Sequence, residues 1–198
     1  MNAPNALTIS RIVFAPIFVI LLFQKGAWPT YMATLFFLLA GLSDYWDGYL
    51  ARKRGEVTKL GRFLDPLADK ILTSASFISF AFMHIIEAWM VYVMIAREVG
   101  VTALRVYAIW RKRPLVTSRL AKWKTSLQMT VIFAILVLLC VQVSRSTDGR
   151  WDLSPGSWLL WVINGLVFGV MLLAAITGIH YLVQNAILPR KREGGKPS

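Results

Sequence analysis

Apolar residues follow one another in long uncharged runs along this chain, and polar residues gather between the runs. The runs cover residues 12–24, 26–43, 71–86, 88–96, 125–144 and 153–189. A helix needs about 20 mostly apolar residues to span a bilayer, so several runs must extend into their charged flanks. The pattern predicts an all-α integral membrane protein with six transmembrane helices.

Positive charges between the runs fall mostly on one side of the predicted helices. With a cytoplasmic N-terminus, segments 51–62, 111–124 and 190–198 face the cytoplasm and carry five, six and four Lys or Arg. The opposite side holds three, which are Lys25, Arg145 and Arg150. This asymmetry follows the positive-inside rule, whereas five or seven spans would put basic loops on both sides. We therefore expect six spans with both termini in the cytoplasm.

Composition fits this class and argues against nucleic-acid binding. The hydrophobic fraction is 57% and the mean hydropathy is +0.57, which is too apolar for an ordinary soluble domain. The formal net charge is +12, but the basic residues are divided among membrane-adjacent segments. Anionic lipid headgroups and phosphate-bearing substrates fit that distribution better than nucleic acid does. We expect one membrane domain over residues 1–189 and a basic, disordered tail over residues 190–198.

Several single residues have packing or interfacial interpretations. Four tryptophans near the ends of the runs are typical of membrane-interface anchors; they are Trp28, Trp151, Trp158 and Trp161. Cys140, the one cysteine, is expected to pack inside the fifth span. His84 and His180 are each flanked by apolar residues, which favours an interfacial or packing role.

Acidic residues are scarce, yet four of them gather in one 26-residue window. The chain has ten Asp and Glu against twenty-two Lys and Arg. Asp44 and Asp47 are three positions apart, and Asp65 and Asp69 are four apart, so each pair shares a helix face. The first pair closes the second predicted span and the second pair opens the third, with Pro66 compatible with a first helical turn. A helical hairpin then brings the two pairs together at the cytoplasmic end.

Four clustered carboxylates repel one another strongly unless cations lie among them. Hard divalent cations prefer oxygen ligands, and two metals clamp both the attacking and the leaving oxygens of an in-line displacement at phosphorus. The small residues Gly48, Ala51 and Gly61 let a ligand or a helix approach closely. The structural alternative is salt bridging at a wet membrane edge with Arg52, Lys53, Arg54, Lys59 and Arg62.

The four acids belong to a longer motif. This motif is complete from Asp44 to Asp69. It reads Asp-x-x-Asp-Gly-x-x-Ala-Arg, then eight residues, then Gly-x-x-x-Asp-x-x-x-Asp. It resembles the signature of the CDP-alcohol phosphotransferases, membrane enzymes that join a CDP-activated alcohol to a second alcohol and release CMP. The resemblance implies a six-span homodimer in which Asp44, Asp47, Asp65 and Asp69 bind two divalent cations, Mg²⁺ or Mn²⁺. It also implies that Asp69 accepts the proton of the incoming hydroxyl.

The resemblance extends to a binding site for the CDP-linked lipid. Gly48, Arg52 and Thr58 match positions that contact the CDP moiety. The N-terminal segment PNALTISR resembles the Pro-Asn-x-Leu-Thr-x-x-Arg opening of family members, in which Asn5 is the candidate nucleotide contact. The candidate CDP-lipid contacts are Asn5, Gly48, Ala51, Arg52, Thr58 and Gly61.

Basic residues in the fourth and fifth apolar segments are candidates for binding the second substrate. Arg97 and Glu98 interrupt the fourth segment, and Arg105 lies about two helical turns beyond Arg97. The fifth segment is entered through Lys122 and Lys124. Side chains converging on the carboxylates from both segments form an anion pocket. An internal salt link between Arg97 and Glu98 is the structural alternative.

These two segments look like those of the phosphatidylglycerophosphate synthases, whose acceptor is sn-glycerol 3-phosphate. The resemblance runs from Pro4 to about Thr130 and leaves the last run as apolar filler. It implies transfer of the phosphatidyl group of CDP-diacylglycerol to sn-glycerol 3-phosphate at the cytoplasmic side of a bacterial inner membrane. Three alternatives stay open: a sister enzyme using inositol phosphate or phosphatidylglycerol, an ion-coupled transporter, and a non-catalytic scaffold.

Overall fold

Six α-helices account for the backbone that this computed structural model describes. The described backbone comprises residues 3–24, 26–54, 59–110, 120–146 and 156–182. Side chains within it are described for residues 13–24, 26–43, 70–104, 125–146 and 156–180. The helices are α1 (Ala3–Phe23), α2 (Ala27–Arg54), α3 (Lys59–Phe82), α4 (Ala88–Trp110), α5 (Leu120–Arg145) and α6 (Trp158–Leu182). The predicted all-helical fold is confirmed for this part of the chain.

The helices are longer than the apolar runs that predicted them, above all at the acidic segment. α2 continues past Asp47 to Arg54, and α3 begins at Lys59, well before Asp65. Continuing the helix lets backbone N–H and C=O groups pair with one another as the chain leaves its apolar surroundings. Asp47 and Asp65 therefore lie within helices, and the prediction that Asp65 and Pro66 belong to a first helical turn is wrong. Pro66 lies beyond the first turn of α3 rather than within it.

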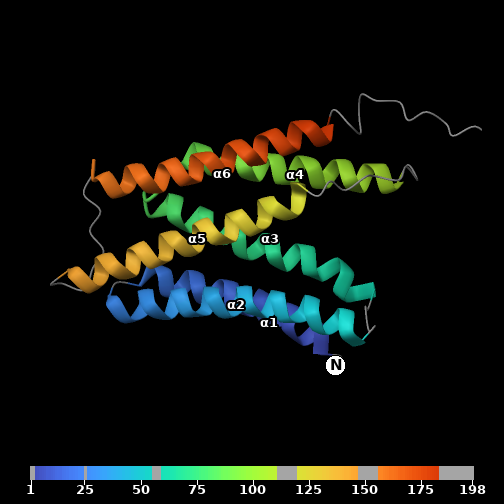
Figure 1. The fold of residues 1–198 in the computed structure, drawn as a ribbon, viewed down its shortest axis with the longest axis horizontal. Helices are drawn as coiled ribbons and strands as arrows, with labels where there is room; N and C mark the ends of the chain where they lie inside the picture. The colour runs from blue at the N-terminus through green and yellow to red at the C-terminus, as the bar shows by residue number, and fades with distance from the viewer. Residues whose placement is uncertain (1–2, 25, 55–58, 111–119, 147–155, 183–198) are drawn as a thin grey trace, which may run out of the picture.

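The helices form an elongated bundle in which successive helices run in opposite directions (Figure 1). Each helix packs against two neighbours in a closed ring, whose order is α1, α2, α5, α6, α4, α3 and back to α1. α3 and α5 also touch across the middle of this closed order. Large buried side chains such as Phe18, Phe80, Ile132 and Ile163 fill the interior. Their burial, at about 1.5–3 kcal/mol for each large side chain, is the main force holding the helices together.

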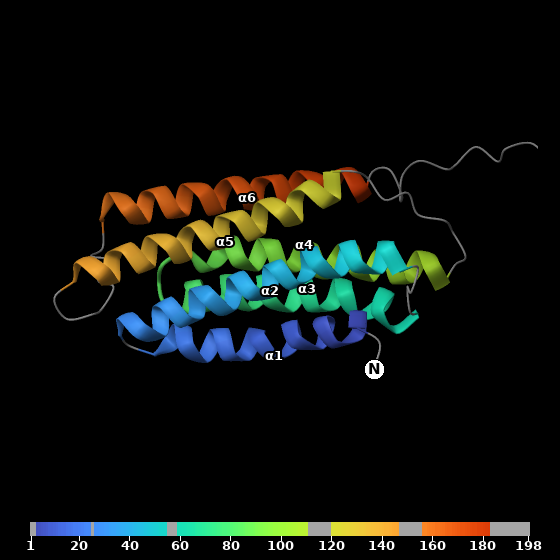
Figure 2. The same cartoon turned by 60° about the horizontal axis from the view of Figure 1, so that its bottom comes forward.

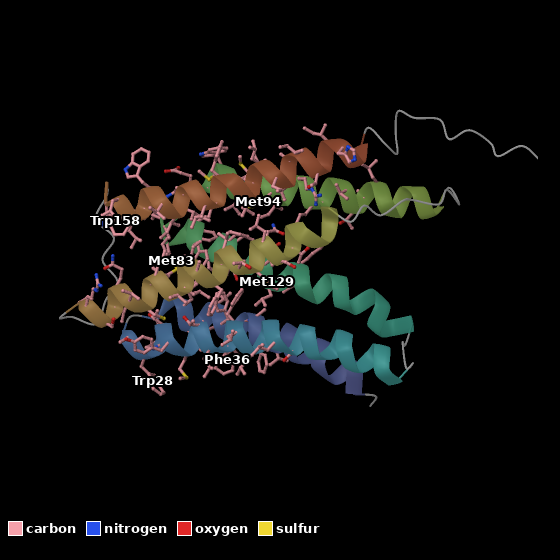
Figure 3. All side chains as sticks on the ribbon, viewed as in Figure 1. Trp28, Phe36, Met83, Met94, Met129 and Trp158 are labelled. Carbon is pink, nitrogen blue, oxygen red and sulfur yellow. The ribbon has the colours of Figure 1, made fainter. Side chains whose placement is uncertain are left out.

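Alternation of direction brings one end of every helix to the same end of the bundle as the start of α1. At that end lie the starts of α1, α3 and α5 and the ends of α2, α4 and α6 (Figures 1 and 2). Trp28 and Trp158 lie at the opposite end and are 70% and 74% exposed (Figure 3). This arrangement agrees with interfacial anchoring for these two tryptophans, and Trp151 lies outside the described residues.

The connection between α3 and α4 is a tight turn that α6 holds in place. The amide of Ile85 donates to the carbonyl of Phe80 and the amide of His84 donates to that of Ala81, which is a Schellman ending. His84 has a φ of 56°, in the left-handed region that favours glycine. From α6, Asn164 donates to the carbonyl of Ile85 at 3.2 Å and accepts from the amide of Glu87 at 3.0 Å.

The outer surface of the bundle is apolar on several helices. Exposed large hydrophobic residues include Ile20, Leu35, Tyr92, Val141 and Leu172, which come from five different helices. A soluble protein rarely exposes so much apolar surface, whereas a lipid-facing surface requires it.

Two helices of the described region are long and apolar enough to cross a bilayer, over Thr125–Arg145 and Trp158–His180. Shorter apolar segments occupy parts of α1, α2 and α3, over Val13–Phe23, Ala27–Ser43 and Lys70–Phe82. Together with the apolar outer surface, these segments support a membrane protein. The count of six spans and the orientation of the termini stay predictions.

Candidate active site

The two acid pairs lie on two different helices, α2 and α3, near the same end of the bundle. Asp44 and Asp47 belong to α2, and Asp65 and Asp69 belong to α3, which runs back from that end (Figure 2). Because both helices continue through their acid pair, the positions of each pair share one helix face, as predicted. The side chains of all four acids lie outside the described side chains.

α2 and α3 are not the closely packed pair that a simple hairpin suggests. Within the described part of the chain, no close backbone contact joins them, and both pack instead against α1 and α5. They therefore occupy diagonal positions in the four-helix group made by α1, α2, α5 and α3. Space between diagonal helices suits ligands better than a direct helix contact does, because side chains and a bound group can fill it.

The other candidate contacts are distributed over the same end of the bundle. Asn5 lies in the first turn of α1, Gly48, Ala51 and Arg52 lie on α2, and Gly61 lies on α3. Arg105 lies near the end of α4, and Lys122 and Lys124 lie near the start of α5. The side chains of these residues are outside the described set, and Thr58 lies outside the described residues altogether. The fold thus gathers the segments that carry them.

Arg97 is the acceptor-site candidate whose side chain is described, and its guanidinium reaches α6. Nε of Arg97 donates to the carbonyl of Ala174 at 3.0 Å, and Nη2 donates to Oγ1 of Thr177 at 3.0 Å. Thr177 Oγ1 lies 2.8 Å from the carbonyl of Leu173, so it can donate there while it accepts from Arg97. The half-buried cation is thereby hydrogen-bonded inside the bundle.

A second polar link joins α4 to the helix that carries Asp69. Nζ of Lys70 donates to Oγ1 of Thr102, and Thr102 Oγ1 lies 2.8 Å from the carbonyl of Glu98. Lys70 directly follows Asp69 in α3, and Thr102 stands three positions before Arg105 in α4. The contact fixes the part of α4 that carries the basic candidates against the acidic helix.

A small cavity with a mixed polar and apolar lining lies one helical turn deeper in the bundle than Asp69 and Lys124. Its volume is about 10 Å³, and it is lined by Thr73, Ser74, Glu98 and Gln128 together with Phe77, Val91, Met94 and Ile95. Gln128, one of the lining residues, is only 4% exposed. The volume is at the lower limit for one water molecule, and the four polar residues are hydrogen-bond partners for it. The described polar side chains of α3, α4 and α5 therefore converge beneath the candidate site.

A larger apolar cavity opens between α2 and α5. It has a volume of about 380 Å³ and is lined by Phe37, Leu38, Gly41, Leu42, Thr125, Ser126, Met129, Thr130 and Phe133. Met129 lies at mid-length of the bundle (Figure 3). Leu42 stands two positions before Asp44, and Thr125 follows Lys124 directly. We call this cavity the α2–α5 groove; it begins where the candidate site ends.

The donor set of the acid pairs fits hard divalent cations. Among the residues with described side chains, no group of three or more His, Cys, Asp or Glu could hold a metal, and the four acids stand outside that set. Four carboxylates on two uninterrupted helices offer oxygen donors alone, which is the ligand type that Mg²⁺ and Mn²⁺ prefer. Asp44, Asp47, Asp65 and Asp69 would hold these ions.

Sequence reasoning treated the last helix as apolar filler, and the structure corrects this. Thr177 and the carbonyl of Ala174 bind Arg97, while Asn164 binds the α3–α4 turn. Gly178 leaves room for the stem of Arg97, because a methyl group there would lie 2.8 Å from Cγ of Arg97. A Thr-Gly pair and one Asn within an otherwise apolar run were the available signal. Cys140 packs as predicted, with Sγ 3.2 Å from Oγ1 of Thr34.

Comparison with known proteins gives a consistent result. The sequence model of one family, described as CDP-alcohol phosphatidyltransferase, matches residues 1–179. A CDP-diacylglycerol–glycerol-3-phosphate 3-phosphatidyltransferase of Bacillus subtilis is 37% identical over 148 residues, 69% of this chain and 77% of that protein. A protein of the same name from Rickettsia typhi is 37% identical over 180 residues, 91% of this chain and 94% of that protein. Another, from Pectobacterium atrosepticum, is 33% identical over 141 residues, 68% of this chain and 76% of that protein.

Proposed function

The chain belongs to the CDP-alcohol phosphatidyltransferase family, and on that premise we propose that it transfers the phosphatidyl group of CDP-diacylglycerol to sn-glycerol 3-phosphate. The products are phosphatidylglycerophosphate and CMP. Relatives that carry this activity in their names match up to 91% of the chain at 37% identity, which supports the choice of acceptor. A sister activity with inositol phosphate or phosphatidylglycerol as acceptor remains the alternative.

The observation that carries the proposal is the convergence of acidic and basic helix segments at one end of the bundle. The segments of α2 and α3 with the complete acidic motif reach that end together with the basic segments of α4 and α5 (Figures 1 and 2). A CDP-linked lipid and a phosphorylated acceptor are both anionic, so such a site needs carboxylates for metal binding and cations for the acceptor phosphate. A transporter would instead place its ionisable residues near the middle of the membrane.

The residues of α1, α2 and α3 are assigned to the CDP-lipid. Asn5, Arg52 and Thr58 would contact the cytidine and pyrophosphate, while Gly48, Ala51 and Gly61 would let that ligand approach the backbone. Two divalent cations, Mg²⁺ or Mn²⁺, held by Asp44, Asp47, Asp65 and Asp69, would when bound offset negative charge on the pyrophosphate oxygens.

Asp69 is assigned the role of general base. Its carboxylate takes the proton of a glycerol hydroxyl as that oxygen forms a bond to the lipid-bearing phosphorus, and the bond from this phosphorus to the CMP oxygen breaks. CMP leaves with the electron pair of that bond. The acceptor phosphate is held by Arg97, Arg105, Lys122 and Lys124, which position the hydroxyl for attack.

The α2–α5 groove is assigned to an acyl chain of the CDP-lipid. Its lining is mostly apolar, and its volume of about 380 Å³ is within the range typical of ligand pockets. It begins beside Leu42, which precedes the first acid pair by less than one helical turn. A lipid with its pyrophosphate at Asp44 would therefore extend one chain along this groove.

The cellular setting follows from the same assignments. We propose that the chain is a homodimer in a bacterial inner membrane, with the acidic end of the bundle facing the cytoplasm. The positive charges of segments 51–62 and 111–124 support this orientation.

The test is CMP release by the purified chain with CDP-diacylglycerol and Mg²⁺, with and without sn-glycerol 3-phosphate. We expect release to require this acceptor and to fall roughly 10²–10⁴-fold in an Asp69→Asn variant, which is the contribution of a general base. Glu87→Gln is the matched control, because Glu87 is an exposed carboxylate at the opposite end of the bundle.

Each other outcome has a distinct meaning. Release with inositol phosphate or phosphatidylglycerol instead of sn-glycerol 3-phosphate would keep the chemistry and replace the acceptor. Solute uptake into proteoliposomes without consumption of CDP-lipid would favour a transporter. An absence of release with every acceptor would contradict the enzyme assignment.

A further inference from the structure

Arg97 belongs to α4, and its guanidinium is hydrogen-bonded to the last helix, α6. We propose that Thr177, Gly178 and the carbonyl of Ala174 form a seat on α6, here called the α6 seat, that positions Arg97 for the acceptor phosphate. The inference rests on the proposed function, since it assigns the α6 residues a part in acceptor binding. Thr177 and Gly178 are positioning residues, because they act through Arg97.

The first support is the hydrogen bonding of the guanidinium. Its Nε and Nη2 atoms donate to two neighbouring groups of α6, the Ala174 carbonyl and Thr177 Oγ1, both at 3.0 Å. Two contacts from one planar group fix both the position and the rotation of its plane.

The second support is the room that Gly178 provides. A methyl group at this position would lie 2.8 Å from Cγ, 3.1 Å from Nε and 3.5 Å from Cδ of Arg97. The stem of Arg97 therefore passes directly over Gly178, and any side chain there must displace it. Other glycines of the same helix differ, since a methyl group at Gly165 or Gly169 would meet nothing within 4 Å.

The third support is that α4, which carries Arg97, is joined by side-chain contacts to both α6 and α3. α4 is joined to α6 through Arg97 and to α3 through the contact between Thr102 and Lys70. Lys70 follows Asp69, so the same stretch of α4 is linked to the segment that carries the general base. These contacts hold the Arg97 segment of α4 in place relative to the segment of α3 that carries Asp69. Such preorganisation lowers the cost of binding a charged ligand.

The experiment measures the KM for sn-glycerol 3-phosphate and the KM for CDP-diacylglycerol separately, using the whole chain in nanodiscs. Thr177→Val removes the hydroxyl at nearly constant shape, and Gly178→Ala displaces the Arg97 stem. We expect each to raise the KM for sn-glycerol 3-phosphate roughly tenfold, which is the effect of losing one hydrogen bond to a charged group, and to leave the KM for CDP-diacylglycerol unchanged. Thr177→Ser keeps the hydroxyl and should restore the wild-type value, and Gly169→Ala should also match wild type.

A double-mutant cycle separates positioning from a general effect on folding. In an Arg97→Ala background, Thr177→Val and Gly178→Ala should have no further effect on acceptor KM, because the group that they position is gone. Additive effects in that background would overturn the α6 seat. Equal changes in both KM values, or wild-type behaviour of Thr177→Val, would also overturn it.

Failure of the proposed function would look different. In that case the wild-type chain itself would show no dependence on sn-glycerol 3-phosphate, whatever the variants do. If the acceptor dependence holds and the variants fail the cycle, the enzyme assignment survives and the α6 seat does not. Variants that do not fold are recognised by loss of a monodisperse elution peak, and Thr177→Val and Thr177→Ser then decide the outcome.

Discussion

Replacing Asn164 by leucine is expected to weaken the α3–α4 turn without changing catalysis. Asn164 gives this turn two hydrogen bonds from α6, to the carbonyl of Ile85 at 3.2 Å and from the amide of Glu87 at 3.0 Å. Leucine has a similar volume, so the main effect of the substitution is the loss of these two hydrogen bonds. The turn lies at the end of the bundle opposite the acid pairs (Figure 1), so turnover per folded molecule should be unchanged.

The magnitude follows from where the two partners lie. A hydrogen bond between helices of a membrane bundle contributes about 0.6 kcal/mol on average, and one in a soluble protein about 0.5–1.5 kcal/mol. Ile85 is buried, so its carbonyl loses a partner that water cannot easily replace, whereas Glu87 is exposed and its amide can be hydrated. We expect the free energy of unfolding to fall by about 2 kcal/mol, mostly through the Ile85 carbonyl.

The assay is equilibrium unfolding in mixed dodecylmaltoside and SDS micelles, followed by tryptophan fluorescence. CMP release is measured on the same preparations. Gly165→Ala is the control, since it alters the neighbouring position of α6, where a methyl group meets nothing within 4 Å. It should not destabilise the chain, because alanine favours a helix over glycine by about 1 kcal/mol. A loss below about 0.5 kcal/mol in Asn164→Leu, the range of a neutral substitution, would refute the role of Asn164, as would a parallel fall in turnover.

Three further predictions concern the same turn, the metal site and the α2–α5 groove. His84→Gly should raise the free energy of unfolding by about 1 kcal/mol in the same assay, because His84 has a φ of 56°; no gain would show that this backbone is not strained. Treatment with EDTA should abolish CMP release and added Mg²⁺ or Mn²⁺ should restore it, while release that persists after complete chelation would contradict a metal role for the four acids. Gly41→Leu should raise the KM for CDP-diacylglycerol several-fold, about 1 kcal/mol of lost binding, by filling the groove, and should leave the KM for sn-glycerol 3-phosphate unchanged. An unchanged lipid KM would exclude the groove as the acyl-chain site.

Helical structure was predictable from the sequence because it depends on neighbours along the chain. Each apolar run identified a helix, and the six helices of the described region correspond one to one with the six runs. Helix ends were less predictable. α2 continues past Asp47 to Arg54, because polar residues that form helices well extend a helix that the apolar run has already started.

The arrangement of the helices depended on contacts that the sequence does not show. α2 and α3 follow one another in the chain, yet within the described residues they pack against α1 and α5 instead of each other. Arg97 and Thr177 are eighty positions apart and are hydrogen-bonded. Apolar helices carry little pattern to say which face meets which neighbour, so packing of the whole bundle settles those pairs.

For the candidate site, the sequence by itself determined the chemical groups: two acid pairs at helical spacing, small residues beside them, and basic residues in two later segments. Their types and spacing point to metal-assisted chemistry on phosphates, and local helix geometry is enough to put each pair on one face. Only the tertiary structure decided that Arg97 binds α6, through Thr177 and the carbonyl of Ala174 and next to Gly178. The reason is physical. A half-buried guanidinium must find hydrogen-bond acceptors, and the packing of α4 against α6 determines which acceptors are within reach.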